Sequence, residues 1–115
     1  MIEKIVQDLV DDLAAGGAHF DVVPAGVARP YITLQQVGGA PVAYLSGESG
    51  CDIVRMQIDV FGDSRTQANE VMTSLRQRLC GEPLLARPVG APFSNYESNV
   101  NTYRRSCDFY ILAKI

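Results

Sequence analysis

A segment near the middle of the sequence, from Asp52 to Phe61, alternates between apolar and polar side chains. In an extended strand, Met56, Ile58 and Val60 would point to one side and the residues between them to the other. The polar positions are Arg55, Gln57 and Asp59. This pattern predicts a strand with one face on a core and the opposite face open.

A helix is predicted directly after this strand. Ser64 can accept a hydrogen bond from the first unpaired N–H groups of a helix, and Gln67 stands three residues later, as in a capping box. Gly81 and Pro83 end the helix. Its apolar stripe consists of Ala68, Val71, Met72, Leu75 and Leu79. At about 1.5 Å per residue, the helix is comparable in length to the strand and can lie along it.

The N-terminal part predicts a second helix and two more strands. Residues Ile2 to Leu13 form an amphipathic helix that Gly16 and Gly17 stop. Its apolar positions are Ile2, Ile5, Val6, Leu9, Val10 and Leu13. A short edge strand is expected from His19 to Val23, and Tyr31 to Val37 alternates like a half-covered strand.

Four further segments complete the expected fold. The glycine-rich stretch from Gly38 to Gly50 predicts a mobile hairpin, called here the hairpin arm. Residues 82–92, rich in proline and glycine, are expected to be irregular. Two strands are expected at 93–97 and 103–112.

The order of these elements is α-β-β-β-α-β-β, without the βαβ alternation of a parallel sheet. We therefore predict an α+β fold, a two-layer sandwich with a mainly antiparallel sheet and two helices on one face. The length of 115 residues fits one domain, residues 1–115.

Composition excludes several classes of protein. The net charge of -3 is opposite to the basic surface that nucleic-acid binding requires. No apolar run approaches the roughly 20 residues of a membrane span, and charges interrupt any signal-peptide core, so neither membrane insertion nor secretion is expected. The cysteines Cys51, Cys80 and Cys107 lack the close spacing of a zinc or redox site and are expected to be reduced packing residues.

One tripeptide, Gly62-Asp63-Ser64, suggests catalysis because it joins a strand to a helix, as the nucleophile of a Gly-Asp-Ser hydrolase would. Such an enzyme also needs a base, and the single histidine, His19, lies far upstream near an edge strand. A helix cap explains Ser64 better. The acidic residues Asp8, Asp11 and Asp12 are expected to be a solvated helix face, so we predict no catalytic residue, metal or cofactor.

Several segments together resemble the tail-completion (tail-terminator) family of long-tailed phages. The resemblance covers most of the chain and depends on the order and spacing of short motifs. They are the N-terminal amphipathic helix, Arg29-Pro30-Tyr31-Ile32-Thr33-Leu34-Gln35, Arg55-Met56-Gln57-Ile58-Asp59-Val60-Phe61, Ala68-Asn69-Glu70-Val71, Tyr96-Glu97 and Tyr103-Arg104-Arg105-Ser106-Cys107-Asp108-Phe109.

The resemblance implies a structural protein of the virion tail, assembled in the bacterial cytoplasm. Such a protein caps the tail tube as a homo-hexameric ring, ends tail polymerisation and joins the tail to the head. The implied partners are other copies of itself, the tail-tube protein and the head-tail connector, and the subunit can be a monomer in solution. DNA would pass through the ring without specific binding.

Two candidate contact surfaces follow from the strand pattern. The open face of the two central strands is expected to carry polar residues beside Phe61, Tyr110 and Leu112. This face either points to solvent, which we favour, with Arg and Asp pairing across the strands, or meets a neighbouring subunit. The hairpin arm offers a second, apolar surface. The candidate interface residues are Val42, Tyr44, Leu45, Arg55, Gln57, Asp59, Arg104, Asp108 and Tyr110. The alternatives are a small Gly-Asp-Ser hydrolase, or another head-tail connector or baseplate subunit.

Overall fold

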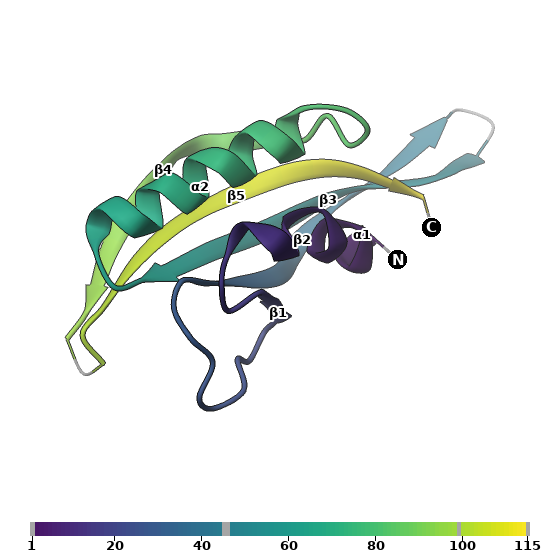
Figure 1. Cartoon of the computed structure of the whole chain (residues 1–115). Coiled ribbons are helices and arrows are strands. Elements are labelled where there is room, and N and C mark those ends of the chain that lie inside the picture. Colours follow the sequence, from purple (N-terminus) through teal and green to yellow (C-terminus); the bar gives the residue numbers. More distant parts are fainter. Residues whose placement is uncertain (1, 45–46, 99, 115) are drawn as a thin grey trace.

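The computed structural model describes residues 2–44, 47–98 and 100–114, with the backbone alone at 41–44, 47–49 and 114. Within these residues the chain forms two α-helices, one 3₁₀ turn and five strands (Figure 1). They are α1 (Ile2–Val10), η1 (Asp11–Leu13), β1 (Ala18–Phe20), β2 (Tyr31–Tyr44), β3 (Gly47–Gly62), α2 (Arg65–Cys80), β4 (Arg87–Glu97) and β5 (Thr102–Lys114). The predicted α+β class and element order are confirmed.

The strands form one sheet in the order β1-β2-β3-β5-β4. The β2–β3, β3–β5 and β4–β5 pairs are antiparallel, which confirms the mainly antiparallel prediction. The short edge strand β1 pairs in parallel with β2, with Ala18 opposite Ile32 and Phe20 opposite Leu34. It is shorter than the predicted 19–23, because residues 21–30 turn back to carry the chain to the start of β2.

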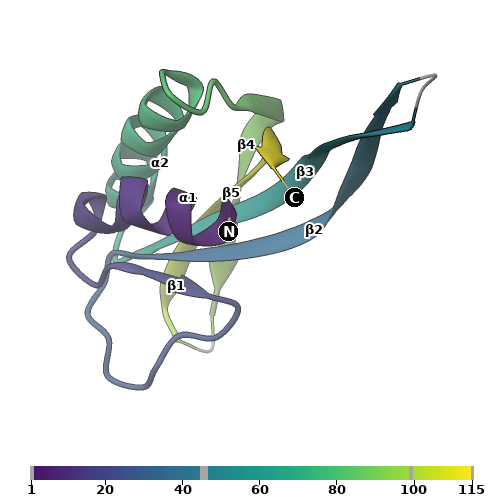
Figure 2. The same cartoon turned by 90° about the vertical axis from the view of Figure 1, so that its right-hand side faces the viewer.

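Both helices cover the same face of the sheet, as Figure 2 shows. The core between the two layers contains inward-facing residues of the central strands, such as Ile58 and Phe109, and of α2, such as Met72 and Leu75, all fully buried. Burial of this apolar surface is the main favourable contribution to folding. The predicted two-layer arrangement is therefore observed.

Helix α1 differs from its prediction in one residue and in length. Val6 and Val10 are fully buried, but Ile5 is 47% exposed. Ile2, Val6 and Val10 are spaced four residues apart and lie on the side of α1 that contacts the core. Ile5 lies at the margin of this apolar stripe. The α-helix ends at Val10, and a 3₁₀ turn extends it to Leu13.

Helix α2 begins as predicted. The hydroxyl of Ser64 accepts a hydrogen bond from the Gln67 N–H at 3.0 Å, and the Gln67 side chain accepts one from the Asp63 N–H at 2.7 Å. Near its other end, Arg78 donates to the Leu9 carbonyl and to the Asp12 carboxylate, at 3.0 and 2.6 Å. Arg78 thus connects α2 to α1 and to the 3₁₀ turn that follows it.

The hairpin arm is a continuation of two strands. The pairing of β2 with β3 includes Gly38 opposite Arg55 and continues to Tyr44 opposite Gly47. Both strands therefore extend into the stretch from Gly38 to Gly50, which the sequence predicted as a separate hairpin. Gly39 is required at its position, because a Cβ there would overlap the carbonyl oxygen of Ile53. The predicted hairpin is confirmed, and it adds to a molecule with a longest dimension of 52 Å.

The prediction that residues 82–92 are irregular is wrong from Arg87 onward, where β4 begins. Prolines 88 and 92 are tolerated because β4 is the outer strand of the sheet, where one side of the backbone needs no partner. The register of β4 against β5 also shifts between Val89 and Phe93, which accommodates the intervening residues. The two predicted final strands, 93–97 and 103–112, lie within β4 and β5.

Candidate subunit interface

The face of the sheet opposite the helices is called here the open face. The register of β3 and β5 places Arg55 opposite Tyr110 and Gln57 opposite Asp108, so these four predicted interface residues share that face. Their chain neighbours Met56 and Phe109 are fully buried on the helical side. The alternation in the sequence therefore assigned both faces correctly.

Arg55 and Asp108 form an ion pair across these strands. The Arg55 Nη2 and Nε atoms lie 2.8 and 2.9 Å from the same Asp108 carboxylate oxygen. The hydrogen bond to Asp108 raises the pKa of Arg55, so the guanidinium remains charged. Its carbon also lies 5.9 Å from the centroid of the Tyr110 ring. The pair orients the long Arg55 side chain across the middle of the open face.

A second polar cluster centres on Asp59, which is only 7% exposed. Its carboxylate accepts hydrogen bonds from Arg104 at 3.0 Å, from Gln57 at 3.2 Å and from the hydroxyl of Ser106. Arg104 also lies 3.7 Å from the carboxylate of Glu97. The polar groups of this cluster are therefore largely satisfied within the chain.

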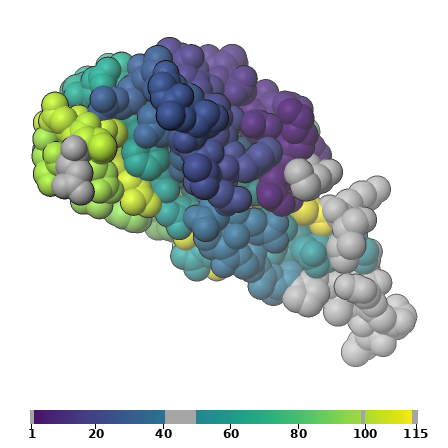
Figure 3. Space-filling model, turned by 90° about the horizontal axis from the view of Figure 1, so that it is seen from below, coloured from purple at the N-terminus to yellow at the C-terminus, as the bar shows by residue number. Residues whose placement is uncertain are grey.

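The loop that follows β1 partly covers this polar cluster. Val22 and Val23 of the loop line a cavity of about 370 Å³ together with Thr33, Asp59 and Arg104. In Figure 3 the loop is the dark blue surface beside the strands. Three of the predicted interface residues, Gln57, Asp59 and Arg104, thus lie where the chain already provides partners and cover.

The other end of the open face is apolar and uncovered. Five large apolar side chains are exposed there: Val37 (41%), Ile53 (39%), Leu85 (60%), Tyr110 (40%) and Leu112 (62%). They line a groove of about 1020 Å³, called here the apolar groove, to which Arg55 and Arg87 also contribute. None of the described residues that line it carries a carboxylate. Exposed apolar surface of this kind often marks a contact site.

Among the exposed apolar residues of this groove, sequence reasoning missed Val37, Ile53 and Leu85. Ile53 could have been found, because it stands two positions before Arg55 in the same alternation and therefore shares its face. Leu85 could not, since it comes from the connection between α2 and β4, which folds back toward the sheet. Val37 lies at a register shift between Gln36 and Gly38.

The predicted interface residues of the hairpin arm remain predictions. Val42 and Tyr44 lie in β2, but their side chains are outside the described part of the molecule, as is Leu45 altogether. The backbone pairing of the arm, with Val42 opposite Cys51, is described.

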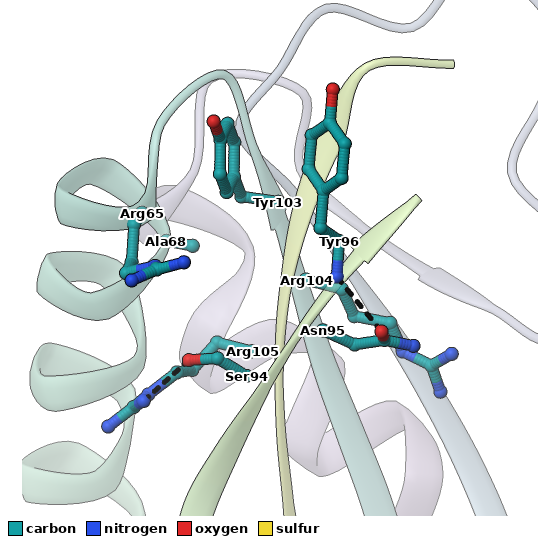
Figure 4. A pocket seen from close by; sticks show the side chains of 8 residues that line it. All are labelled: Arg65, Ala68, Ser94, Asn95, Tyr96, Tyr103, Arg104 and Arg105. Carbon is teal, nitrogen blue, oxygen red and sulfur yellow. Dashed lines mark hydrogen bonds between the residues drawn. The ribbon is translucent and has the colours of Figure 1, made fainter. Parts of the chain in front are cut away.

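A smaller pocket lies where the start of α2 meets β4 and β5 (Figure 4). Its volume is about 160 Å³, and Arg65, Tyr103 and Arg105 are among the residues that line it. Arg105 donates a hydrogen bond to the hydroxyl of Ser94 at 2.7 Å. The pocket is much smaller than typical ligand sites of about 300–1,000 Å³, so we assign no ligand to it.

The two residues of the hydrolase hypothesis are engaged elsewhere. Ser64 caps α2, and a ring nitrogen of His19 lies 2.7 Å from the carbonyl oxygen of Gly16. No hydrogen bond in the described residues joins Ser64 to His19. A nucleophile needs its base within hydrogen-bond reach, and this arrangement does not provide one.

The acidic residues near the N-terminus have partners of their own. Asp8 pairs with Lys4 at 3.1 Å, and Asp11 accepts a hydrogen bond from the Ala18 N–H at 2.8 Å. Among residues 2–44, 47–98 and 100–114, no group of His, Cys, Asp and Glu side chains is placed to hold a metal ion. The helices in these ranges are also too short or too polar to cross a membrane.

Comparisons with known proteins agree with this architecture. A chain in a solved structure described as the virion of native gene transfer agent (GTA) particle shares the fold with a TM-score of 0.67 at 20% identity, covering 93% of this chain and 85% of that one. No curated protein sequence matches the chain. The family described as tail completion protein gp17 matches residues 3–113. Because that match spans nearly the whole sequence, the chain belongs to the phage tail completion protein family.

Proposed function

We propose that this chain caps the phage tail tube as a closed ring of copies, ends tail polymerisation and joins the tail to the head. The observation that carries the proposal is the family match over residues 3–113. A structural role needs no catalytic centre, and we propose that the protein is not an enzyme.

Two features of the fold support a ring. A cyclic assembly larger than a dimer needs two different contact surfaces on each copy. The apolar groove and the outer part of the hairpin arm, residues 41–50, are two such surfaces, and they lie on one elongated subunit. We propose six copies in the assembled tail, and a subunit that can remain a monomer in solution until the tube offers a template.

The proposed partners follow from this position in the virion. One side of the ring contacts the tail-tube protein, and the other contacts the head-tail connector. The structural similarity to a chain of the gene transfer agent virion supports a virion location. The net charge of -3 supports a channel through which DNA passes without being held. Assembly takes place in the bacterial cytoplasm before the tail joins a filled head.

Mixing the purified chain with tubes of the cognate tail-tube protein tests the proposal. Electron microscopy is expected to show a ring at one end of each tube, absent from tubes alone. Tubes whose ends stay unchanged would contradict the proposal. Binding only to isolated connectors or baseplates would instead assign the chain to one of those two structures.

A further inference from the structure

We propose that the apolar groove of one copy receives the outer part of the hairpin arm, residues 41–50, of the next copy. This inference depends on the proposed ring and deepens it, because it names the contact that closes the ring.

The groove has the size and chemistry to hold a chain segment. Its volume is about 1020 Å³, and its most exposed apolar side chains, Leu85 and Leu112, are 60% and 62% exposed. Leu85 and Leu112 come from different parts of the sequence, namely the α2–β4 connection and β5, so the groove has walls on two sides. Contact with water at these side chains is unfavourable, and covering them would stabilise a complex.

The base of the arm, at Gly39 and Ala40, lines this groove, and the outer part of the arm continues beyond it. The last pair between β3 and β5 is Cys51 opposite Lys114, whereas β2 and β3 continue pairing to Tyr44 opposite Gly47. The outer arm therefore extends past the last paired residue of β5, as the course of β2 and β3 in Figure 2 shows. To enter the groove of its own copy, the paired strands would have to fold back on themselves.

The sequence of the arm is complementary to the groove. Its centre is apolar, Val42-Ala43-Tyr44-Leu45, and its charged residue is Glu48. The described residues that line the groove are mainly apolar, and their charged members are Arg55 and Arg87, without a carboxylate among them. Arg55 is already paired with Asp108, so Arg87 is the cation that Glu48 would meet. Opposite charges at the edge of an apolar contact favour one register and one partner. The outer part of the arm, residues 41–50, and the groove are different surfaces of one copy. Each copy can therefore contact one neighbour through its arm and the other through its groove, and this contact repeats around a ring.

A photo-crosslinking amino acid at position 112 tests this contact directly. Leu112 is 62% exposed, so its replacement leaves the core intact. The variant is mixed with isotope-labelled wild-type chain and assembled on tail tubes, and mass spectrometry identifies the linked peptides. We expect links from position 112 to residues 41–50 of labelled copies, which only a contact between copies can produce.

The other outcomes separate this inference from the proposed function. Rings on tubes with links from position 112 to the tail-tube protein, or to another part of the neighbouring copy, would overturn the inference and leave the ring in place. If no ring forms on tubes, the proposed function fails. The same mixture at high concentration without tubes then decides the inference, because a lack of links between copies would overturn it as well.

A pair of substitutions gives a second test. Leu112→Asp places a charge in the groove and is expected to weaken association between copies by roughly tenfold or more. Val100→Asp is the matched control, because Val100 has similar exposure, 60%, and lies outside the groove in the turn before β5. Circular dichroism checks that both variants fold. Equal association by the two variants would overturn the inference.

Discussion

Ile53 on β3 lies directly opposite Leu112 on β5, and both side chains are exposed on the face of the sheet that carries no helix. Their neighbours Val54 and Ile111 are 4% and 1% exposed on the helical side. Burial of Val54 and Ile111 therefore stabilises the fold, whereas Ile53 and Leu112 form apolar surface that a single folded copy leaves exposed. Such surface is available to a partner.

Two adjacent alanine substitutions should separate these roles. Ile111→Ala removes a buried side chain and is expected to lower the free energy of unfolding by about 2–5 kcal/mol. Leu112→Ala should change it by no more than about 0.5 kcal/mol. Urea denaturation followed by circular dichroism measures both. Similar losses in the two variants would show that the faces of β5 are assigned wrongly.

Ser64→Ala should affect stability alone. Loss of the cap leaves the Gln67 N–H without its 3.0 Å partner, and the expected cost is about 1 kcal/mol. Ser74→Ala, at an exposed position within α2, is the control and should not destabilise the protein. Esterase activity that the Ser64 variant loses would revive the hydrolase hypothesis.

The Asp59 cluster should matter for folding. Asp59→Asn removes the charge that receives hydrogen bonds from Arg104 and Ser106, and the expected loss is about 1–3 kcal/mol of unfolding free energy. Asp21→Asn is the control, because the Asp21 carboxylate is exposed. The backbone of Asp21 is left-handed, a conformation that asparagine also tolerates, so the effect of this substitution on stability should be small. Thermal unfolding of both variants provides the comparison. An unchanged Asp59→Asn protein would mean that this cluster adds nothing to stability.

Cys107 should make stability fall at alkaline pH. Burial in the core raises the pKa of this thiol, so the folded state keeps its proton at a pH where the unfolded chain has lost it. Its contribution to stability is complete below the unfolded pKa of about 8.5 and is lost as the pH rises toward the higher folded pKa. Urea unfolding at neutral pH and near pH 9.5 should therefore show a steeper decline for wild type than for Cys107→Ala. Equal declines would contradict this.

Much of the fold could be predicted because its signals are local. The alternation from Asp52 to Phe61 and the cap at Ser64 depend on neighbouring residues alone, and both were found as expected. The start of β4 was missed because Pro88 and Gly90 are typical of loops. Within a strand, proline is accepted at the edge of a sheet or at a bulge, and the position of a strand in the sheet is not a local property.

For the candidate interface, too, local signals could be predicted and tertiary ones could not. Alternation placed Arg55 and Asp108 on one face, and their ion pair confirms that they lie together. Which end of that face stays uncovered depends on the loop at residues 21–30 and on Leu85, both brought there by the tertiary fold. The apolar groove therefore became visible only in three dimensions.

The central claim, that this protein ends tail growth, is tested most directly by the lengths of tail tubes formed in its presence. Tail-tube protein that polymerises with increasing amounts of the chain should give progressively shorter tubes, because each capped end stops growing. A length distribution that does not change with the amount of the chain would contradict the account.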